Sequence, residues 1–296
     1  MYVVFFIKKT FIFCYYILAM IKKMTPFVKW AGGKRQLLDK INELKPKKFG
    51  RYFEPFIGGG ALLFDLVPNR FTINDTNKEL ICIYKCLRNK MMYQKMVMLC
   101  DEHEKNHSEE YYYQVRDLDR KRAFKTASSF VKAARCLYLN KACFNGLYRV
   151  NSKGYFNVPF NGKEKVHCFD KDNLESIHKY FIKRKPVILC KDFEKAVATA
   201  KKNDFVYFDP PYDVVADQSF TSYTSDGFGK EEQKRLAKVF KELSNKGVFV
   251  MLSNANTTFI QELYKDFNIH IVNANRRINS KAEGRGNVEE VIITNY

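Results

Sequence analysis

The residues with the clearest chemical potential are Asp209, Pro210, Pro211 and Tyr212, which follow one another directly. They come after the apolar, β-branched and aromatic run 204–208, which is typical of a buried strand. Neither proline nitrogen can donate a hydrogen bond to a neighbouring strand, so the strand ends here in a rigid turn. A carboxylate and a Pro carbonyl oxygen can accept both hydrogens of one amino group, and a Tyr ring can stack on a planar ring. The sequence therefore predicts a seat for an aromatic amine, such as the amino group of adenine or cytosine; the alternative is a plain turn.

A glycine-rich turn lies upstream, between a predicted strand and a predicted helix. The strand covers residues 51–57, the turn is Gly58-Gly59-Gly60, and the helix covers 61–66. Glycines let the backbone approach a ligand closely. A second strand, 70–74, ends at Asp75, where a carboxylate can bind ribose hydroxyls. The spacing differs from the dinucleotide fingerprint and no Walker lysine follows. This favours a nucleoside-like cofactor with little or no phosphate over an ordinary glycine turn.

A third motif contains the only Trp of the chain. It reads Lys-Trp-Ala-Gly-Gly-Lys-Arg at residues 29–35 and leads into a predicted helix. Together with Phe-Glu-Pro-Phe-Ile-Gly-Gly-Gly at 53–60 and Asp-Pro-Pro-Tyr at 209–212, in this order, it resembles the Dam-type family of adenine-specific DNA methyltransferases. The resemblance runs from about Pro26 to Tyr296 and is nearest to the restriction-modification enzymes that methylate adenine in GATC. Further matching segments are residues 145–151, 156–160, 220–224 and 262–296.

The order of predicted elements indicates an interrupted α/β domain. Strands and helices alternate towards both ends of the chain, whereas helical patterns dominate in between. With the resemblance, this implies an α/β, Rossmann-like S-adenosylmethionine-dependent methyltransferase sheet with an inserted helical target-recognition domain. We expect a catalytic, S-adenosylmethionine-binding domain of residues 24–76 and 186–296 and a helical DNA-binding domain of residues 77–185. Residues 268–274 and 288–295 are predicted to form a closing antiparallel pair.

The first residues of the chain are apolar and aromatic but lie outside the resemblance. Residues 1–23 are therefore predicted to be an extension that is not part of the fold. Their longest uninterrupted apolar stretch, 10–21, has 12 residues, fewer than the roughly 20 that a spanning helix needs. A membrane anchor is the weaker alternative, and we expect no membrane association.

The resemblance assigns roles to individual residues. It implies that Asp209 and the Pro210 carbonyl accept the two amino hydrogens of adenine, while Tyr212 stacks on the base. By the same resemblance, the cofactor contacts are Trp30, Lys34, Phe56, Gly58, Gly60, Asp75 and Asp209. Residues 220–224 are expected to form a loop over the flipped base, although an ordinary exposed loop would fit the same residues. No metal is expected, because the scattered Cys and His form no ligand pattern.

A short segment after a predicted helix is expected to contact DNA. The helix, 133–141, is followed by a glycine turn with aromatic, apolar and basic residues around it. Arg can read guanine in the major groove, and an apolar side chain can wedge between base steps. By resemblance, the DNA-binding residues are Phe144, Asn145, Leu147 and Arg149. The alternative is a hairpin packed on the helical region. Residues 161–165 depart from the family pattern, in which an aromatic residue flanked by Gly and Arg often follows, so the flanking contacts stay open.

The charge of the chain agrees with a polyanionic partner. There are 51 Lys and Arg against 32 Asp and Glu, a formal net charge of +19. This favours DNA through counterion release, although a lysine-rich proteome would give the same excess. The predicted function is site-specific transfer of a methyl group from S-adenosylmethionine to the adenine amino group in double-stranded DNA, by base flipping and direct transfer.

The same prediction extends to partners and location. We expect a monomeric, cytoplasmic, nucleoid-associated enzyme, with a cognate restriction endonuclease as a genetic partner that makes no stable contact. Two kinds of alternative remain open at this point. One is an amino-group methyltransferase for cytosine in DNA, for RNA or for a glutamine side chain. The other is a catalytically silent DNA-binding protein.

Overall fold

A seven-stranded sheet forms the centre of the computed structural model, which describes residues 23–30, 37–213, 228–275 and 287–296. The strand order is β3-β2-β1-β4-β5-β7-β6. The first five strands in this order are parallel, and β7 is antiparallel to both of its neighbours. The strands are β1 (Tyr52–Glu54), β2 (Phe71–Asn74), β3 (Val187–Leu189), β4 (Phe205–Phe208), β5 (Phe249–Ala255), β6 (Asn268–Asn275) and β7 (Asn287–Thr294). The predicted Rossmann-like α/β fold and the closing antiparallel pair are confirmed, and β7 lies inside the sheet rather than at its edge.

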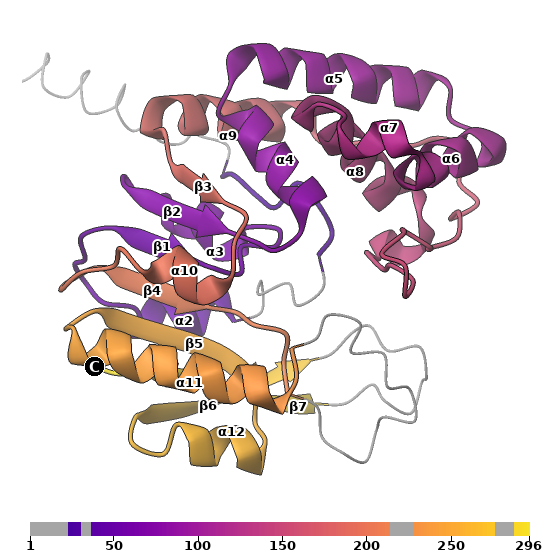
Figure 1. The fold of residues 1–296 in the computed structure, drawn as a ribbon. Coiled ribbons are helices and arrows are strands. Elements are labelled where there is room, and N and C mark those ends of the chain that lie inside the picture. The colour runs from indigo at the N-terminus through magenta and orange to yellow at the C-terminus, as the bar shows by residue number, and fades with distance from the viewer. Residues whose placement is uncertain (1–22, 31–36, 214–227, 276–286) are drawn as a thin grey trace, which may run out of the picture.

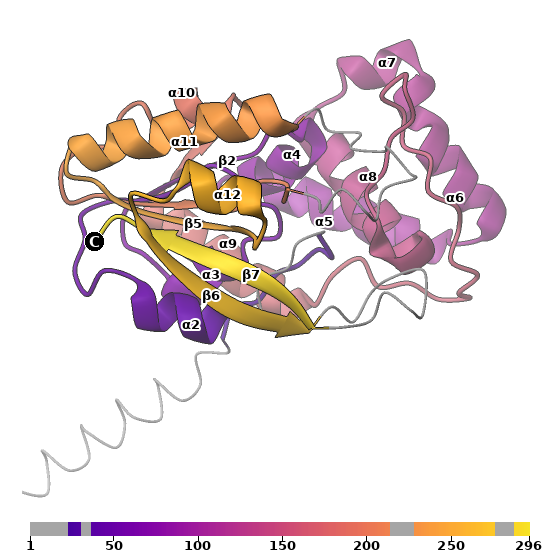
Figure 2. The ribbon, with the colours of Figure 1, turned by 90° about the horizontal axis from the view of Figure 1, so that it is seen from below.

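Alternate strand residues face two separate hydrophobic cores. In β4, Phe205 and Tyr207 belong to one core, whereas Val206 and Phe208 belong to the other. This follows from the two-residue repeat of a strand, and it explains why strands buried on both faces read as continuous apolar runs. Figure 2 shows α2 and α11 on opposite sides of the sheet. The helices that flank the sheet are α2 (Leu38–Leu44), α3 (Ala61–Leu66), α10 (Phe193–Val197), α11 (Lys230–Asn245) and α12 (Thr258–Leu263).

A long helical region joins β2 to β3. In Figure 1, α5 to α8 gather at one end of the molecule, away from α11 and α12. The first core continues from Tyr52 in the sheet through Tyr84 in α4 to Leu137 in α8, so the described helices and the sheet share buried contacts. The expected boundaries between the catalytic and the DNA-binding domain, at residues 76/77 and 185/186, stay a prediction. Of the expected N-terminal extension, residues 1–22 lie outside the described residues. The helices are α4 (Lys78–Leu87), α5 (Lys90–Lys105), α6 (Glu109–Arg116), η2 (Asp117–Arg120), α7 (Arg122–Lys125), α8 (Ser129–Ala142), η3 (Phe144–Gly146) and α9 (Lys171–Arg184).

A buried carboxylate anchors the start of β4, the strand that leads to Asp209. The Asp204 carboxylate accepts hydrogen bonds from the backbone N–H groups of Arg51 and Lys201, at 2.8 and 2.9 Å. The Arg51 guanidinium also donates to it, with Nη2 at 2.7 Å. Burial raises the pKa of the Asp204 carboxyl, but the hydrogen bonds from Arg51 and Lys201 outweigh burial and hold that pKa below its ordinary value.

We expect Asp204→Ala to lower the free energy of unfolding by about 3 kcal/mol, because Arg51 would lose a buried partner. A carboxyl whose pKa is lowered on folding stabilises the fold above its unfolded pKa and loses that contribution as the pH falls through its folded pKa. The difference between the wild type and the variant should therefore shrink in acid. Urea unfolding at about pH 7 and about pH 3 measures this difference. An equal difference at both values would contradict the assignment.

Candidate active site

The order of strands along the sheet reverses between β1 and β4. In open α/β sheets, ligands bind beyond the carboxyl ends of the strands at such a point. The glycine turn at 58–60 follows β1, and the turn from Asp209 to Tyr212 follows β4. Since β1 and β4 are hydrogen-bonded neighbours, with Tyr52 opposite Phe205, the two motifs leave the same edge of the sheet from adjacent strands.

Asp75 is tied to the glycine turn. Its carboxylate accepts hydrogen bonds from the backbone N–H groups of Gly58, at 3.1 Å, and Asn77, at 2.9 Å. Gly58 has a φ of +46°, and a Cβ at this position would lie 2.8 Å from Cδ1 of Trp30. Only glycine therefore fits between the turn and the Trp30 ring. The structure brings Trp30, Gly58 and Asp75 together; their role as cofactor contacts stays a prediction.

The third glycine of the turn, Gly60, is crowded as well. Its φ is +75°, and an added Cβ would lie 2.9 Å from both the Phe64 ring and the Tyr84 hydroxyl. The Tyr84 hydroxyl donates a hydrogen bond to the Gly58 carbonyl at 2.8 Å. The turn is thus fixed by packing and by one buried phenol.

Phe56 lies in a cluster of aromatic rings at this edge. Its ring centroid is 5.6 Å from those of Phe193 and Phe228 and 6.3 Å from that of Phe208. Phe193 begins α10, directly after β3, and it is a residue that sequence reasoning missed. A buried aromatic residue shortly after a parallel strand is a signal that could have identified it.

Asn74 is a second residue that sequence reasoning missed. It is 1% exposed at the end of β2. Its side-chain amide donates to the carbonyl oxygens of Pro55 and Lys191, both at 2.9 Å, and its oxygen accepts from the Lys191 N–H at 2.8 Å. Asn74 therefore holds the loops after β1 and β3 in register with β2. A polar residue at the end of an otherwise apolar strand was the available signal.

The turn that contains Asp209 is supported by side chains from distant elements. Gln233 of α11 donates to the Pro211 carbonyl at 2.9 Å and accepts from Asn254 of β5 at 3.1 Å. The Asn254 oxygen in turn accepts from the Asp213 N–H at 2.9 Å. Gln233 and Asn254 are 1% and 0% exposed. This chain of hydrogen bonds fixes the turn on the side opposite the glycines.

Tyr212 is held at its hydroxyl. The hydroxyl donates to the carboxylate of Glu290, on β7, at 2.9 Å. Burial and the nearby charge of Asp209 raise the pKa of Tyr212 well above its ordinary value, so the phenol keeps its proton for this bond. The ring is thereby fixed in orientation, which a stacking surface requires.

The segment predicted to contact DNA forms a narrow loop rather than regular strands. Isolated bridges join Cys143 to Phe160 and Val150 to Phe156. Phe144 and Leu147 are 51% and 42% exposed. Such exposed apolar side chains favour a projecting loop over the packed hairpin.

The other two predicted residues lie on the same loop and are exposed. Asn145 has a φ of +55°, and the Nε of Arg149 donates to the Asn157 side chain at 2.8 Å. A left-handed conformation suits Asn better than most residues, which fits a tight turn at this point.

The loop also lies against Trp30. The rings of Tyr148 and Trp30 lie 5.2 Å apart between centroids. Asn140 of α8 accepts from the backbone N–H of Lys29 at 2.8 Å and donates to its carbonyl at 2.7 Å. The Lys29 side chain lies against Gly146, so Lys29 is a further residue of this site that sequence reasoning missed. Lys34 and residues 220–224 lie outside the described residues.

Comparison with known proteins decides the family. Residues 30–278 match the model of the D12 class N6 adenine-specific DNA methyltransferases. The chain belongs to this family. It is 47% identical over 274 residues to the type II methyltransferase M1.LlaDCHI of Lactococcus lactis subsp. cremoris, covering 92% of this chain and 96% of that protein.

Two further relatives of this D12 methyltransferase come from other organisms. The type II methyltransferase M.MjaIII of Methanocaldococcus jannaschii is 40% identical, over 93% of this chain and 100% of its own length. A DNA adenine methylase of Haemophilus influenzae is 35% identical, over 91% and 93%. The predicted family is therefore confirmed.

Two features are absent from the part of the D12 methyltransferase that the structure describes. The His, Cys, Asp and Glu side chains of this part form no group of three that could hold a metal ion. Among the helices within the described ranges, none combines the length and the hydropathy that a bilayer crossing needs.

Proposed function

We propose that the protein transfers a methyl group from S-adenosylmethionine to the amino nitrogen of adenine in double-stranded DNA, within GATC, on a base extruded from the helix. The observation that carries the proposal is the meeting of the Asp209 turn and the Gly58 turn on adjacent strands at the switch point of the sheet. The family supports adenine in DNA as the target. The GATC context rests on the resemblance of the motifs.

Asp209, Pro210 and Tyr212 have separate tasks in this proposal. The adenine amino nitrogen is a poor nucleophile, because its lone pair is delocalised into the ring. Hydrogen bonds from this group to the Asp209 carboxylate and the Pro210 carbonyl would draw it towards a tetrahedral geometry. After transfer the nitrogen carries one proton too many, and Asp209, which already accepts that N–H, can take it. The Tyr212 ring would stack on the base, which requires extrusion from the duplex.

The residues around the glycine turn fit a nucleoside-like donor. Asp75 is half-buried at the carboxyl end of β2, where its carboxylate can reach ribose hydroxyls. Trp30 and Phe56 supply aromatic surface beside Gly58 and Gly60. S-adenosylmethionine, when bound, supplies a methyl group that its sulfonium already activates. Lys34 remains part of this proposal by resemblance alone.

The partners follow from the same proposal. Two relatives are named type II methyltransferases, which supports a restriction-modification role with an endonuclease as genetic partner. The proposal also includes that the enzyme is a monomer and makes no stable contact with the endonuclease. It further includes a cytoplasmic, nucleoid-associated location.

The proposal is tested by incubating the purified full chain with S-adenosylmethionine and a library of duplexes that contains every short sequence context. Sequencing that reports modified bases should find N6-methyladenine, concentrated in GATC. Methyl groups on cytosine, or unmodified DNA in all contexts, would overturn the proposal. Adenine methylation in another context would overturn the GATC part alone.

Within this proposal, Arg149→Ala should relax the preference at one base pair of the target by about 1–3 kcal/mol. The expected cause is the loss of a side chain that can form two hydrogen bonds with guanine. Rates on the cognate duplex and on duplexes with one substituted base pair measure the preference. Lys153→Ala, an exposed lysine of the same loop, serves as the matched control and should weaken binding equally on all duplexes. An unchanged preference in Arg149→Ala would move base reading to other residues.

A further inference from the structure

A buried arginine lies beside residues 143–160, the loop proposed to contact DNA and called here the DNA-contacting loop. Arg135 of α8 is 1% exposed. Its Nη1 donates to both carboxylate oxygens of Glu79, each at 2.7 Å, and its Nη2 lies 2.8 Å from a carboxylate oxygen of Asp119. Its remaining hydrogen bonds go to the carbonyl oxygens of Val115 and Arg116. The cost of removing charged groups from water offsets most of the attraction within a buried ion pair. Such a cluster is therefore weak evidence of stabilisation, and the segments that it connects indicate another role.

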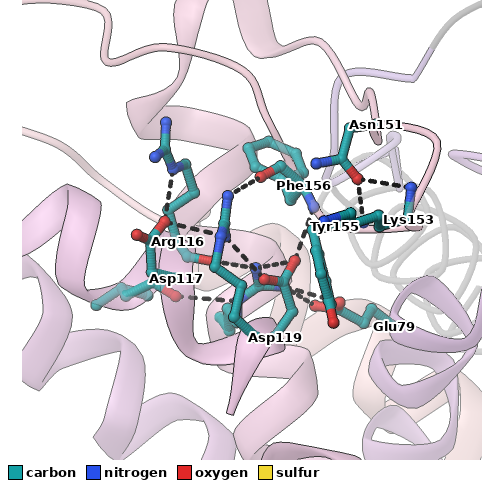
Figure 3. Close-up of polar contacts among 11 residues, drawn as sticks. Glu79, Arg116, Asp117, Asp119, Asn151, Lys153, Tyr155 and Phe156 are labelled. Carbon is teal, nitrogen blue, oxygen red and sulfur yellow. Dashed lines mark hydrogen bonds and ion pairs between the residues drawn. The ribbon is translucent and has the colours of Figure 1, made fainter.

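The two carboxylates of the cluster belong to segments with different tasks. Glu79 lies in the first turn of α4, four residues after Asp75, on the cofactor side. Asp119 lies in η2, and its carboxylate accepts a hydrogen bond from the Phe156 N–H at 2.7 Å. Figure 3 shows Glu79, Asp119 and Phe156 in one cluster that polar contacts connect. Arg135 therefore links the segment after β2 to the loop.

Contacts within the loop connect Phe156, which Asp119 holds, to Arg149. Phe156 is bridged to Val150, and the N–H of Asn157 donates to the Arg149 carbonyl at 3.1 Å. The Arg149 side chain donates in turn to Asn157. Arg149, the residue proposed to read the target, is thus hydrogen-bonded to Asn157, whose neighbour in the chain, Phe156, is held by Asp119. A change in the position of Asp119 would displace Arg149 relative to α4.

We propose that Arg135 is a positioning residue for target recognition, because its ion pairs with Glu79 and Asp119 set the DNA-contacting loop relative to the cofactor side of the site. This inference rests on the proposed function and adds a residue that touches neither substrate. A rigid fork that bonds two carboxylates at once cannot be replaced by the single ammonium group of lysine. Arg135→Lys keeps the charge while removing the link.

The test compares Arg135→Lys with the wild type on the cognate duplex and on duplexes with one substituted base pair. We expect the ratio of the two rates to fall about tenfold, since residues outside a site typically change coupling by a factor of roughly 2 to 30. The KM for S-adenosylmethionine should stay within about twofold of the wild type. Asp119→Asn, which weakens the same link from its other end, should lower the ratio as well. If Arg135→Lys fails to fold, the result for Asp119→Asn decides.

Arg88→Lys is the matched control. Arg88 follows the other end of α4, is exposed, and donates to the Pro186 carbonyl at 2.7 Å, away from the loop. Arg88→Lys should leave the ratio unchanged, and because Arg88 is exposed it should cost less thermal stability than Arg135→Lys. An unchanged ratio in folded Arg135→Lys, or an equal fall in Arg88→Lys, would overturn the inference. Absence of adenine methylation by the wild type would instead refute the proposed function, so the two failures are distinguishable.

Discussion

Asp209→Ala is expected to reduce methyl transfer by about a thousandfold or more, because the variant loses the acceptor that we propose activates the adenine amino group and takes its proton. The Asp209 side chain lies at the end of β4. Gln233 and Asn254 hold the turn that follows through hydrogen bonds to its backbone, and their side-chain amides are hydrogen-bonded to each other. Those contacts do not involve the Asp209 side chain, so the turn should keep its shape. Single-turnover transfer from a radiolabelled donor to a cognate duplex measures the loss.

Asp213→Asn provides the control for Asp209. Asp213 belongs to the same turn. Its carboxylate accepts a hydrogen bond from the hydroxyl of Thr257, the residue before α12, at 2.7 Å. An amide oxygen can accept the same bond, so transfer should stay within about threefold of the wild type. Thermal unfolding should show that both variants fold. Full activity of a folded Asp209→Ala protein would remove Asp209 from the mechanism.

The second large effect is expected at Asp75. Asp75→Ala should weaken S-adenosylmethionine binding by roughly 10-fold to 100-fold, which corresponds to about 1.5–3 kcal/mol for hydrogen bonds to a charged group. The lost carboxylate is the group proposed to bind ribose hydroxyls, and it also accepts a hydrogen bond from the Gly58 N–H. Isothermal titration calorimetry measures the dissociation constant. The affinity for cognate DNA, measured separately, should change little.

Asp65→Ala separates a loss at the site from a general loss of stability. Asp65 of α3 is likewise partly buried and hydrogen-bonded, to Asn42 at 2.6 Å, and it pairs with Lys23 at 2.6 Å. It should lower stability while leaving the dissociation constant for S-adenosylmethionine intact. Equal weakening of binding by both variants would show that Asp75 acts through the fold alone.

The fold and the main motifs could be predicted because their signals are local. The apolar run before Asp209 and the glycines after β1 identify strand ends, and parallel strand ends share one edge of a sheet. Element limits were less accurate: the helix predicted at 133–141 extends over Ser129–Ala142. The antiparallel pair was predicted correctly. The position of β7 beside β5 was not, because it depends on pairing between segments that are remote in sequence.

The supporting residues could not be predicted because their partners are far away in sequence. Gln233 and Asn254 meet at the Asp209 turn only after α11 and β5 have packed together. Asn74 is recognisable as a polar residue in a strand, but its bonds to Lys191 depend on β3 lying beside β2. Arg135 sits in a helix of mixed polarity, where nothing marks it as buried. Long-range pairing, rather than local pattern, selects such residues.

The pairing of β2 with β3 has a consequence for how the protein reaches its native state. The whole region from α4 to α9 separates these two neighbours along the chain. Joining them closes a long loop, with an entropy cost that increases with loop length, and such remote contacts form slowly. Compaction of the helices brings the two strands within reach, and the Asn74 bonds to Lys191 form at that junction. During refolding, the helical region should therefore gain protection from hydrogen exchange before the molecule becomes able to hold its methyl donor.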